Sequence, residues 1–408
     1  MRFFALPKLS VTIAICLVTL MAGSAMAETY YVGTNGLNGR TARTASNRNT
    51  PWRSIQRGMD AARAGDTIVV LDGTYWENIV VTNSGNENNL IRLEAENQHG
   101  ALIVGSITGF GIRYLVIDGF RITNRRTDAP QSKGLFFGFS HHLTIRNNRV
   151  FSCRGGGISL DQCDWLLVEW NITHHNAFFD PDQHSGISIY QPQEAFAGRD
   201  AGRPIGIVVR NNTSFSNENL VNNRLFGRPT DGNGIVIDDT RNETAPTGNF
   251  VTYPRRILVE NNLCYSNGGQ GVHCFQSRDV YIRNNTCFQN LRSFDFGGEI
   301  SVVDSDDVRV YNNLLVARAG RNVNLQFESR NIWWNYNLLH NGPSFGVRNG
   351  NNTIFSQPFF RPGTFELESF SPAIDAGLTQ SGTFPLDVNG NQRVQSGRIE
   401  LGAVEHND

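Results

Sequence analysis

The feature that most constrains this chain is a short strand motif that recurs from Leu115 to about Leu339. Its copies read LVIDGFRI, LTIRNNRV, LVEWNITH, IVVRNNTS, ILVENNLC, VYIRNNTC, VRVYNNLL and IWWNYNLL. After a variable gap a second short strand follows, as in GLFFG, GISLD, GISIY, GIVID, GVHCF, EISVV and NVNLQ. Short strands that repeat at roughly two dozen residues, separated by Gly and Asn turns, predict a solenoid.

The repeats lack the longer apolar periodicity of crossover helices, so a doubly wound sheet is not expected. We expect an all-β, single-domain, right-handed parallel β-helix whose coils stack at about 4.8 Å. Residues 28–114 would form the N-terminal cap and first coils, 115–340 the coils with groove-forming insertions, and 341–408 a C-terminal coil and cap that closes the last coil. An amphipathic helix at 51–62, with Trp52, Ile55, Met59 and Ala62 on one face, is the predicted N-terminal cap.

Stacking accounts for much of the polar repetition. One asparagine of each coil falls in a single column, which predicts a ladder that satisfies turn backbone groups: Asn148, Asn171, Asn212, Asn262, Asn285 and Asn313. Cys264 and Cys287 share another column, where a disulfide or two stacked thiols would fit. The cysteines after residue 27 are odd in number, which excludes a complete disulfide framework.

The N-terminus resembles a secretory signal peptide over residues 1–27. Arg2 and Lys8 precede an apolar run, and Ala25-Met26-Ala27 fits a cleavage site. We therefore expect a secreted or periplasmic protein with no integral membrane segment after cleavage. Without Arg2 and Lys8, 34 basic residues face 37 acidic ones, a formal charge of −3 that gives no support for a nucleic-acid partner. A monomer is expected.

Several segments carry a family resemblance: TYYVGTNG, PWRSIQRGMDAARAGDTIVVLDGTYWE, the LxIxNN coils, and SPAIDAG through LGAVE. They resemble the secreted parallel β-helix proteins, which include pectate lyases, alginate lyases, chondroitinase B, mannuronan C5-epimerases and polygalacturonases. The resemblance implies the fold and an acidic polysaccharide as substrate, lying across the sheet formed by the second strands. It leaves the reaction open, because this fold hosts several chemistries.

Three insertions locate the expected groove: 125–133, 178–184 and 217–233. All precede a second strand, so they should gather at one edge of one sheet, where binding loops tend to lie. Alternation along these strands turns every other residue outward. One outward column should run Phe136, Ser159, Ser188, Val236, His273, Ser301, and the next Gly138, Asp161, Tyr190, Asp238, Phe275, Val303.

The insertion FFDPDQHSGISI adds Asp180, Asp182 and His184 at the entrance to a strand. Its DPDQH is loosely similar to the DPH element of mannuronan C5-epimerases, which carries their catalytic acid and histidine. It departs from that element because Asp182 and Gln183 separate the proline from the histidine.

These residues support a lyase that removes the C5 proton of a uronate and then eliminates the leaving oxygen. The catalytic candidates are Lys133, His184, Tyr190, Asp238 and His273; the substrate-binding candidates are Arg154, Asp161, Phe179 and Asp239. Asp180, Asp182 and Asp231 are candidate ligands for Ca²⁺, which prefers oxygen donors. A C5-epimerase, a glycoside hydrolase with paired aspartates, and a glycan-binding protein without catalysis remain open as alternatives.

Overall fold

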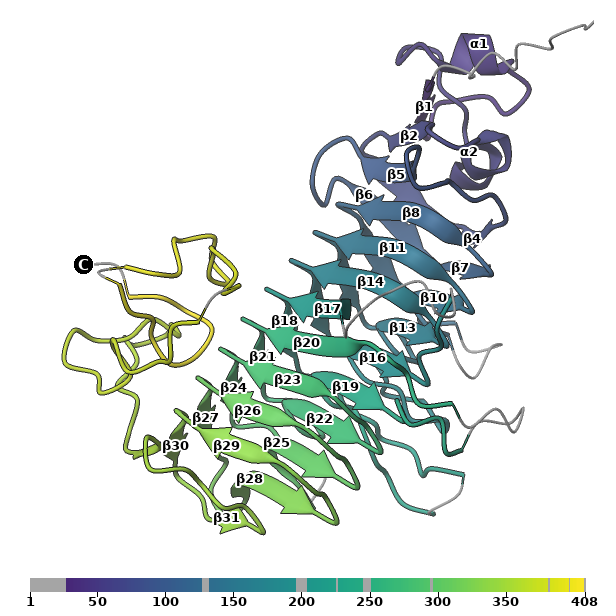
Figure 1. Ribbon diagram of the computed structural model, residues 1–408. Coiled ribbons are helices and arrows are strands. Elements are labelled where there is room, and N and C mark those ends of the chain that lie inside the picture. The colour runs from purple at the N-terminus through teal and green to yellow at the C-terminus, as the bar shows by residue number, and fades with distance from the viewer. Residues whose placement is uncertain are drawn as a thin grey trace, which may run out of the picture.

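The computed structural model describes residues 27–126, 132–195, 204–224, 227–244, 251–293, 296–380, 382–395 and 397–406. Within these ranges the chain winds into coils that each contribute one strand to three long parallel sheets, A, B and C (Figure 1). The predicted all-β, right-handed parallel β-helix is confirmed.

The strands of the three sheets stack in chain order. Sheet A holds β1 (Thr29–Val32), β2 (Thr67–Val70), β5 (Ile91–Ala95), β8 (Arg113–Asp118), β11 (His141–Arg146), β14 (Asp164–Glu169), β17 (Ile205–Arg210), β20 (Arg256–Glu260), β23 (Val280–Arg283), β26 (Arg309–Tyr311) and β29 (Trp333–Asn335). Sheet B holds β3 (Gly73–Tyr75), β6 (Ala101–Val104), β9 (Arg121–Thr123), β12 (Arg149–Phe151), β15 (Ile172–His174), β18 (Thr213–Phe215), β21 (Leu263–Tyr265), β24 (Thr286–Phe288), β27 (Leu314–Val316), β30 (Leu338–His340) and β32 (Ile354–Phe355). Sheet C holds β4 (Asn78–Val81), β7 (Ser106–Phe110), β10 (Leu135–Gly138), β13 (Ile158–Asp161), β16 (Ile187–Tyr190), β19 (Ile235–Asp238), β22 (Val272–Phe275), β25 (Gly298–Val303), β28 (Asn322–Phe327) and β31 (Ser344–Phe345).

The N-terminal cap is shorter than predicted. Helix α2 covers Ile55–Ala61, with the Ser54 side chain accepting from the backbone N–H of Arg57 as N-cap. Trp52 precedes the helix and pairs in a parallel bridge with Val32. Its ring is nevertheless fully buried, as the amphipathic pattern predicts. A second, four-residue helix, α1 (Ala42–Ala45), was not predicted.

The core of the solenoid is a stack of inward-facing aliphatic side chains, and the turns are held by a buried asparagine ladder. Each ladder Oδ1 accepts from the backbone N–H of the preceding ladder asparagine at 3.0–3.1 Å, from Asn148 onward to Asn337. The residue before most of them is also asparagine and adopts a left-handed backbone, as at Asn211 and Asn261. Asparagine tolerates that conformation, so the repeated NN pair joins a turn residue to a ladder residue. The predicted ladder is confirmed.

A second ladder was not predicted from the sequence. Asn176, Asn217, Asn267 and Asn290 form equivalent bonds at the turn from sheet B to sheet C. It ends on Glu299, whose carboxyl group accepts from the Asn290 backbone N–H at 2.9 Å and from its Nδ2 at 2.5 Å. Cys264 and Cys287 are paired in register in sheet B; both are buried and free.

The C-terminal segment folds back along the flank of the solenoid (Figure 1). Asn211 Nδ2 donates to the Asp387 carbonyl at 2.6 Å, and Asn261 Nδ2 donates to the Leu386 carbonyl at 3.1 Å. Strands β31 and β32 form the expected C-terminal coil, but the segment that follows does not close that coil as expected: it contacts turns of the middle coils. Long-range contacts decide its path, and no local pattern encodes them.

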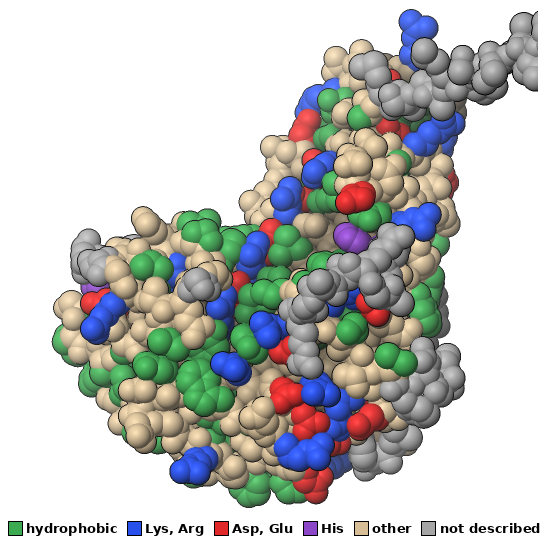
Figure 2. Space-filling view, viewed as in Figure 1, with side chains coloured by type: hydrophobic (Ala, Val, Ile, Leu, Met, Phe, Trp, Pro, Cys, Tyr) green, Lys and Arg blue, Asp and Glu red, His purple; other side chains and the backbone are tan. Residues whose placement is uncertain are grey.

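Charges on the face shown in Figure 2 are interspersed, with Lys and Arg next to Asp and Glu. Several are paired across neighbouring strands of sheet A, as in Arg146–Asp118 and Arg210–Glu169. Among the residues that the structure describes, no helix is long and apolar enough to cross a membrane.

Candidate active site

Sheet C presents the outward-facing columns that the sequence predicts. Asp161 is paired in register with Tyr190, and Tyr190 with Asp238. His273 lies beside Val236 one strand further on. The intervening Ile189 and Ile237 are fully buried in the core, which confirms the predicted alternation.

Asp180 and His184 form a hydrogen-bonded pair in the loop that precedes β16. His184 Nδ1 lies 2.9 Å from Asp180 Oδ2. The Asp180 side chain is fully buried, whereas the His184 ring remains 13% exposed. Burial alone would raise the pKa of Asp180, but its contact with His184, helped by Lys133, lowers that pKa below the usual value. The pair therefore places an oriented imidazole edge at the surface of the groove.

The loop around this pair is held from several sides. Asp180 Oδ1 accepts from the Asp182 backbone N–H at 3.0 Å, and the Asp180 carbonyl accepts from Asn219 Nδ2 at 2.6 Å. His184 lies directly over Gly156, where an added Cβ would come within 2.6 Å of the histidine Cβ. A glycine at 156 is thus required for the close approach of the histidine.

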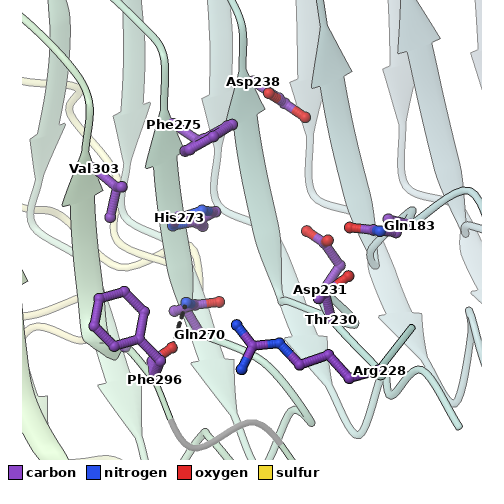
Figure 3. A pocket seen from close by; sticks show the side chains of 11 residues that line it. Gln183, Arg228, Thr230, Asp231, Asp238, Gln270, His273, Phe275, Phe296 and Val303 are labelled. Carbon is purple, nitrogen blue, oxygen red and sulfur yellow. Dashed lines mark hydrogen bonds between the residues drawn. The ribbon is translucent and has the colours of Figure 1, made fainter. Parts of the chain in front are cut away.

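A cavity of about 220 Å³ opens on sheet C one coil beyond this pair. It is lined by Gln183, Arg228, Thr230, Asp231, Asp238, Gln270, His273, Phe275, Phe296, Gly297 and Val303. Figure 3 shows Asp231 and His273 directed into the same space, with the Arg228 guanidinium beside Gln270. The predicted residues Asp231, Asp238 and His273 are therefore brought together.

The two aspartates of the cavity hold their protons unusually tightly. Burial under the loops raises the pKa of Asp231 to about 6, and the hydrogen bond from Asn233 Nδ2 offsets only part of this. Burial also raises the pKa of Asp238 well above its usual range, and the neighbouring Asp231, Asp239 and Asp161 raise it further. Asp238 is therefore suited to donate a proton or a hydrogen bond near neutral pH, and Asp231 to do so in mildly acidic solution.

His273 has the opposite tendency. Burial lowers its pKa to about 4, which keeps the ring neutral. Its Nδ1 is buried and has no hydrogen-bond partner in the described part of the chain. The ring centroid lies 5.8 Å from that of Phe275.

Lys133 lies at the other end of the acidic column. Its Nζ is 4.0 Å from Asp161 Oδ2 and 4.1 Å from the centroid of the Phe136 ring. Asp161 Oδ1 is buried and has no hydrogen-bond partner among the residues described. Because Lys133 also acts on the charge of Asp180, it belongs to the same electrostatic network as the Asp180–His184 pair.

Asp239, predicted to bind substrate, instead holds a turn. Its buried carboxylate accepts from the backbone N–H groups of Glu243 at 2.8 Å and Thr244 at 3.0 Å, and from Gln191 Nε2 at 2.8 Å. The Thr244 hydroxyl also donates to Asp239 Oδ2 at 2.5 Å. Asp239 thus fixes the turn that follows Asp238. Burial raises the pKa of Tyr190, which lies beside Asp238 in sheet C.

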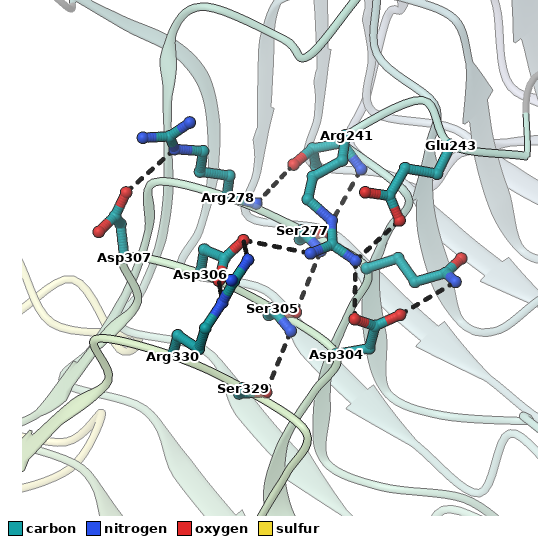
Figure 4. Close-up of polar contacts among 12 residues, drawn as sticks. Arg241, Glu243, Ser277, Arg278, Asp304, Ser305, Asp306, Asp307, Ser329 and Arg330 are labelled. Atoms are coloured by element: carbon teal, nitrogen blue, oxygen red, sulfur yellow. Dashed lines mark hydrogen bonds and ion pairs between the residues drawn. The ribbon is translucent and has the colours of Figure 1, made fainter. Parts of the chain in front are cut away.

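The chain after β19 is also anchored by an ion network (Figure 4). The Arg241 guanidinium contacts Glu243, Asp304 and Asp306 at 2.8–3.1 Å. Beside it, the Ser277 backbone N–H donates to Ser305 Oγ at 3.0 Å, in a short serine ladder. These contacts fix the end of the strand that carries Asp238.

Arg154 and Phe179 pair with each other outside the cavity lining. The guanidinium carbon lies 4.0 Å from the ring centroid, and the Phe179 backbone N–H donates to the Arg154 carbonyl at 2.9 Å. Stacking of this kind leaves the outer edge of the guanidinium able to meet a carboxylate.

The candidate calcium ligands do not converge. Asp180 is engaged with His184, Asp182 with Arg224 at 3.2 Å, and Asp231 with Asn233 at 2.9 Å. No group of three or more His, Cys, Asp or Glu side chains in the described ranges is placed to hold a metal ion. Asp180, Asp182 and Asp231 therefore do not form the predicted calcium site, and the mechanism below uses no metal. Calcium dependence of the protein stays a prediction.

Sequence reasoning missed Gln183, Arg228, Gln270 and Phe296. Gln270 lies two residues before β22, as Lys133 and Asn233 lie two residues before β10 and β19. Aligning the coils from two residues before each strand would therefore have found it. Arg228 and Phe296 lie in gaps of irregular length, where no repeat marks them.

Comparisons with known proteins agree with this architecture. A family model described as "Right handed beta helix region" matches residues 67–251. Among solved structures, the chain is similar to pectate lyase Pel9A at 17% identity and a TM-score of 0.54, with 94% of this chain and 98% of that one covered. A GH136 lacto-N-biosidase from Eubacterium ramulus has 12% identity and a TM-score of 0.46, covering 78% and 57%. The A-module of mannuronan C-5 epimerase AlgE4 from Azotobacter vinelandii has 15% identity and a TM-score of 0.37, covering 80% and 100%.

No curated protein matched the sequence. Identities this low show a shared fold and leave the reaction undecided. The three stacked sheets, the family model and the similarity to Pel9A together show that the chain has the right-handed parallel β-helix fold.

Proposed function

We propose that this protein is a polysaccharide lyase that acts on a uronate-containing chain by removing the C5 proton and eliminating the oxygen at C4. The observation that carries the proposal is the Asp180–His184 pair beside the cavity that holds Asp231 and Asp238. It joins an oriented base to carboxyl groups whose raised pKa values favour the protonated form, which is the pairing that β-elimination needs.

His184 serves as the base in this proposal. A neutral ring that donates its Nδ1–H to Asp180 leaves a lone pair on Nε2, and the ionised Asp180 stabilises the imidazolium that forms. Nε2 takes the C5 proton, the C–H electron pair becomes the C4–C5 double bond, and the C4–O bond breaks. Asp231, which shares an electrostatic interaction with His184, returns a proton to the leaving oxygen.

The substrate carboxylate must be stabilised while C5 is deprotonated. Lys133 and Arg228 are the cationic candidates on either side of the pair, and protonated Asp238 can donate a hydrogen bond to the same carboxylate. The similarity to pectate lyase Pel9A, although too distant to define a reaction, agrees with this substrate class.

C5-epimerisation is the second candidate, since it shares the first proton abstraction. The Asp180–His184 hydrogen bond favours it, because the DPDQH segment that forms it is loosely similar to the DPH element of mannuronan C5-epimerases. The two reactions diverge once the C5 proton has been removed, because an epimerase returns a proton to the opposite face of C5.

One assay set separates the candidates. The protein is incubated with polygalacturonate, alginate and glycosaminoglycans, with added Ca²⁺ or with EDTA. A rise in ultraviolet absorbance from the new double bond identifies a lyase, and solvent hydrogen at C5 with no cleavage identifies an epimerase. New reducing ends without the double bond would contradict both and indicate a hydrolase. Asp161 and Asp238, two strands or about 10 Å apart, would be its acids.

Export also belongs to the proposal. Residues 1–26 lie outside those that the structure describes, so the predicted signal peptide stays a prediction. N-terminal sequencing of the protein recovered from the medium or periplasm tests it: a chain that begins at Glu28 is expected, and an uncleaved chain in the cytosol would contradict it.

A further inference from the structure

Exposed phenylalanines extend the outward column of sheet C beyond the acids at both ends. In register the column reads Phe110, Gly138, Asp161, Tyr190, Asp238, Phe275, Val303 and Phe327. Phe110 is 65% exposed and Phe327 40%. Contiguous exposed apolar surface marks a binding site where single exposed side chains do not, and each of these two phenylalanines has aromatic neighbours.

At the N-terminal end, the Phe110 ring extends along the sheet toward the acids. It lies over Gly138, where an added Cβ would come within 2.7 Å of the ring. Phe136 supports it edge-on at 5.3 Å, and Phe136 also lies under Lys133. The missing side chain at Gly138 therefore makes room for a flat aromatic surface that runs up to the Lys133–Asp161 contact.

At the C-terminal end, the aromatic surface is continuous with the cavity. Phe275 and Phe296 line the cavity, and Phe296 meets Phe327 at 6.0 Å and Phe345 at 6.2 Å. Phe345, on the last strand of sheet C, is exposed. The site is thus flanked by aromatic surface on both sides along the solenoid axis.

We infer that an extended chain of about seven sugar residues crosses sheet C from Phe110 to Phe327, and that the reaction occurs within the chain and not at its end. Seven strand spacings, or roughly 34 Å, separate Phe110 and Phe327 in register, and one spacing is close to the length of a pyranose unit. Asp238 lies four strands from Phe110 and three from Phe327, so the chain continues past the site in both directions. The inference rests on the proposed function for the sugar class, and adds the endo mode and the stacking positions.

The test uses Phe110→Ala and Phe327→Ala, with Phe355→Ala as a matched control. Phe355 is 69% exposed but lies on β32 of sheet B, away from the column. With oligouronates from trimer to octamer, kcat/KM of the unaltered protein should rise up to about the heptamer. Each column variant should lower kcat/KM on the polymer about 2- to 10-fold through KM, while leaving the trimer unaffected. Phe355→Ala should match the unaltered protein.

A kcat/KM that is independent of chain length, or column variants that behave like Phe355→Ala, would overturn the inference and leave the proposed reaction standing. Retardation in native gels containing polygalacturonate or alginate tests the column without turnover. A protein that is inactive yet retarded, with retardation lost only in the column variants, would overturn the proposed function. It would support the column as a glycan-binding surface. If the unaltered protein is not retarded, or if the column variants differ from it in oligomeric state, the column is not a glycan-binding surface.

Discussion

Replacing Asp180 with asparagine changes one charge in the site and almost no volume. Asp180 now uses one oxygen to accept from the Asp182 backbone N–H at 3.0 Å and the other to meet His184 Nδ1 at 2.9 Å. Asparagine has a single oxygen. If that oxygen keeps the Asp182 contact, its NH₂ group faces Nδ1, and His184 must accept there and carry its proton on Nε2.

The opposite amide orientation is unfavourable, because it would turn the NH₂ group toward the Asp182 N–H and leave buried donors unpaired at about 1–3 kcal/mol. The variant should therefore hold the wrong tautomer, with no lone pair on Nε2. Loss of a positioned base lowers kcat by about 10²- to 10⁴-fold. This equals roughly 3–5 kcal/mol of transition-state stabilisation at 1.36 kcal/mol per tenfold.

The assay is kcat from double-bond formation on a uronate polymer across pH 4 to 9. Asp66→Asn is the control, since Asp66 is also a buried carboxylate bonded to backbone N–H groups, but it lies next to β2 at the N-terminal cap. The control should keep the kcat of the unaltered protein. An Asp180→Asn variant with undiminished kcat and an unchanged pH profile would refute the assignment of His184 as an Asp180-oriented base.

Three further variants give four expected outcomes. The pKa of Asp231 is raised to about 6, so its proton-donating form is lost as pH rises through 6: kcat/KM should fall above that pH, and Asp231→Asn should remove this limb. Because the ionised carboxylate is disfavoured in the folded state, the same variant should raise Tm at pH 8 more than at pH 5, and an equal shift at both values would contradict the burial argument. Glu299→Ala leaves two buried donors of Asn290 unpaired and should lower the free energy of unfolding by about 2–4 kcal/mol in urea titrations, whereas less than about 1 kcal/mol would show that the ladder needs no acidic end. Lys133→Met removes a cation next to Asp161 and should raise KM for the uronate polymer about 10-fold; an unchanged KM would remove Lys133 from the substrate site.

Most of the fold could be predicted because a solenoid repeats its local rules. The strand motif, the NN turns and the period-two alternation recur on every coil, so aligning the copies was enough to place Asp161, Tyr190 and Asp238 side by side. The amphipathic cap was found from its own helical periodicity, although its helix begins only at Ile55.

The contacts made inside the irregular gaps could not be predicted. The DPDQH segment placed Asp180 and His184 in one loop, but the 2.9 Å hydrogen bond between them depends on Asn219 and Gly156, which come from other coils. Asp239 follows Asp238 directly, yet its carboxylate accepts hydrogen bonds from the backbone of the turn at Glu243 and Thr244. Sequence adjacency therefore identified the acids without separating the one that lines the cavity from the one that supports it.

The most direct test of the account follows hydrogen at C5 of the substrate by NMR during the reaction. With a uronate polymer, we predict loss of the C5 proton together with formation of the C4–C5 double bond. Both should be abolished in His184→Ala and retained in His175→Ala, whose histidine is exposed on the turn after β15. Cleavage that retains the C5 proton, or full activity in His184→Ala, would contradict proton abstraction by His184 on sheet C.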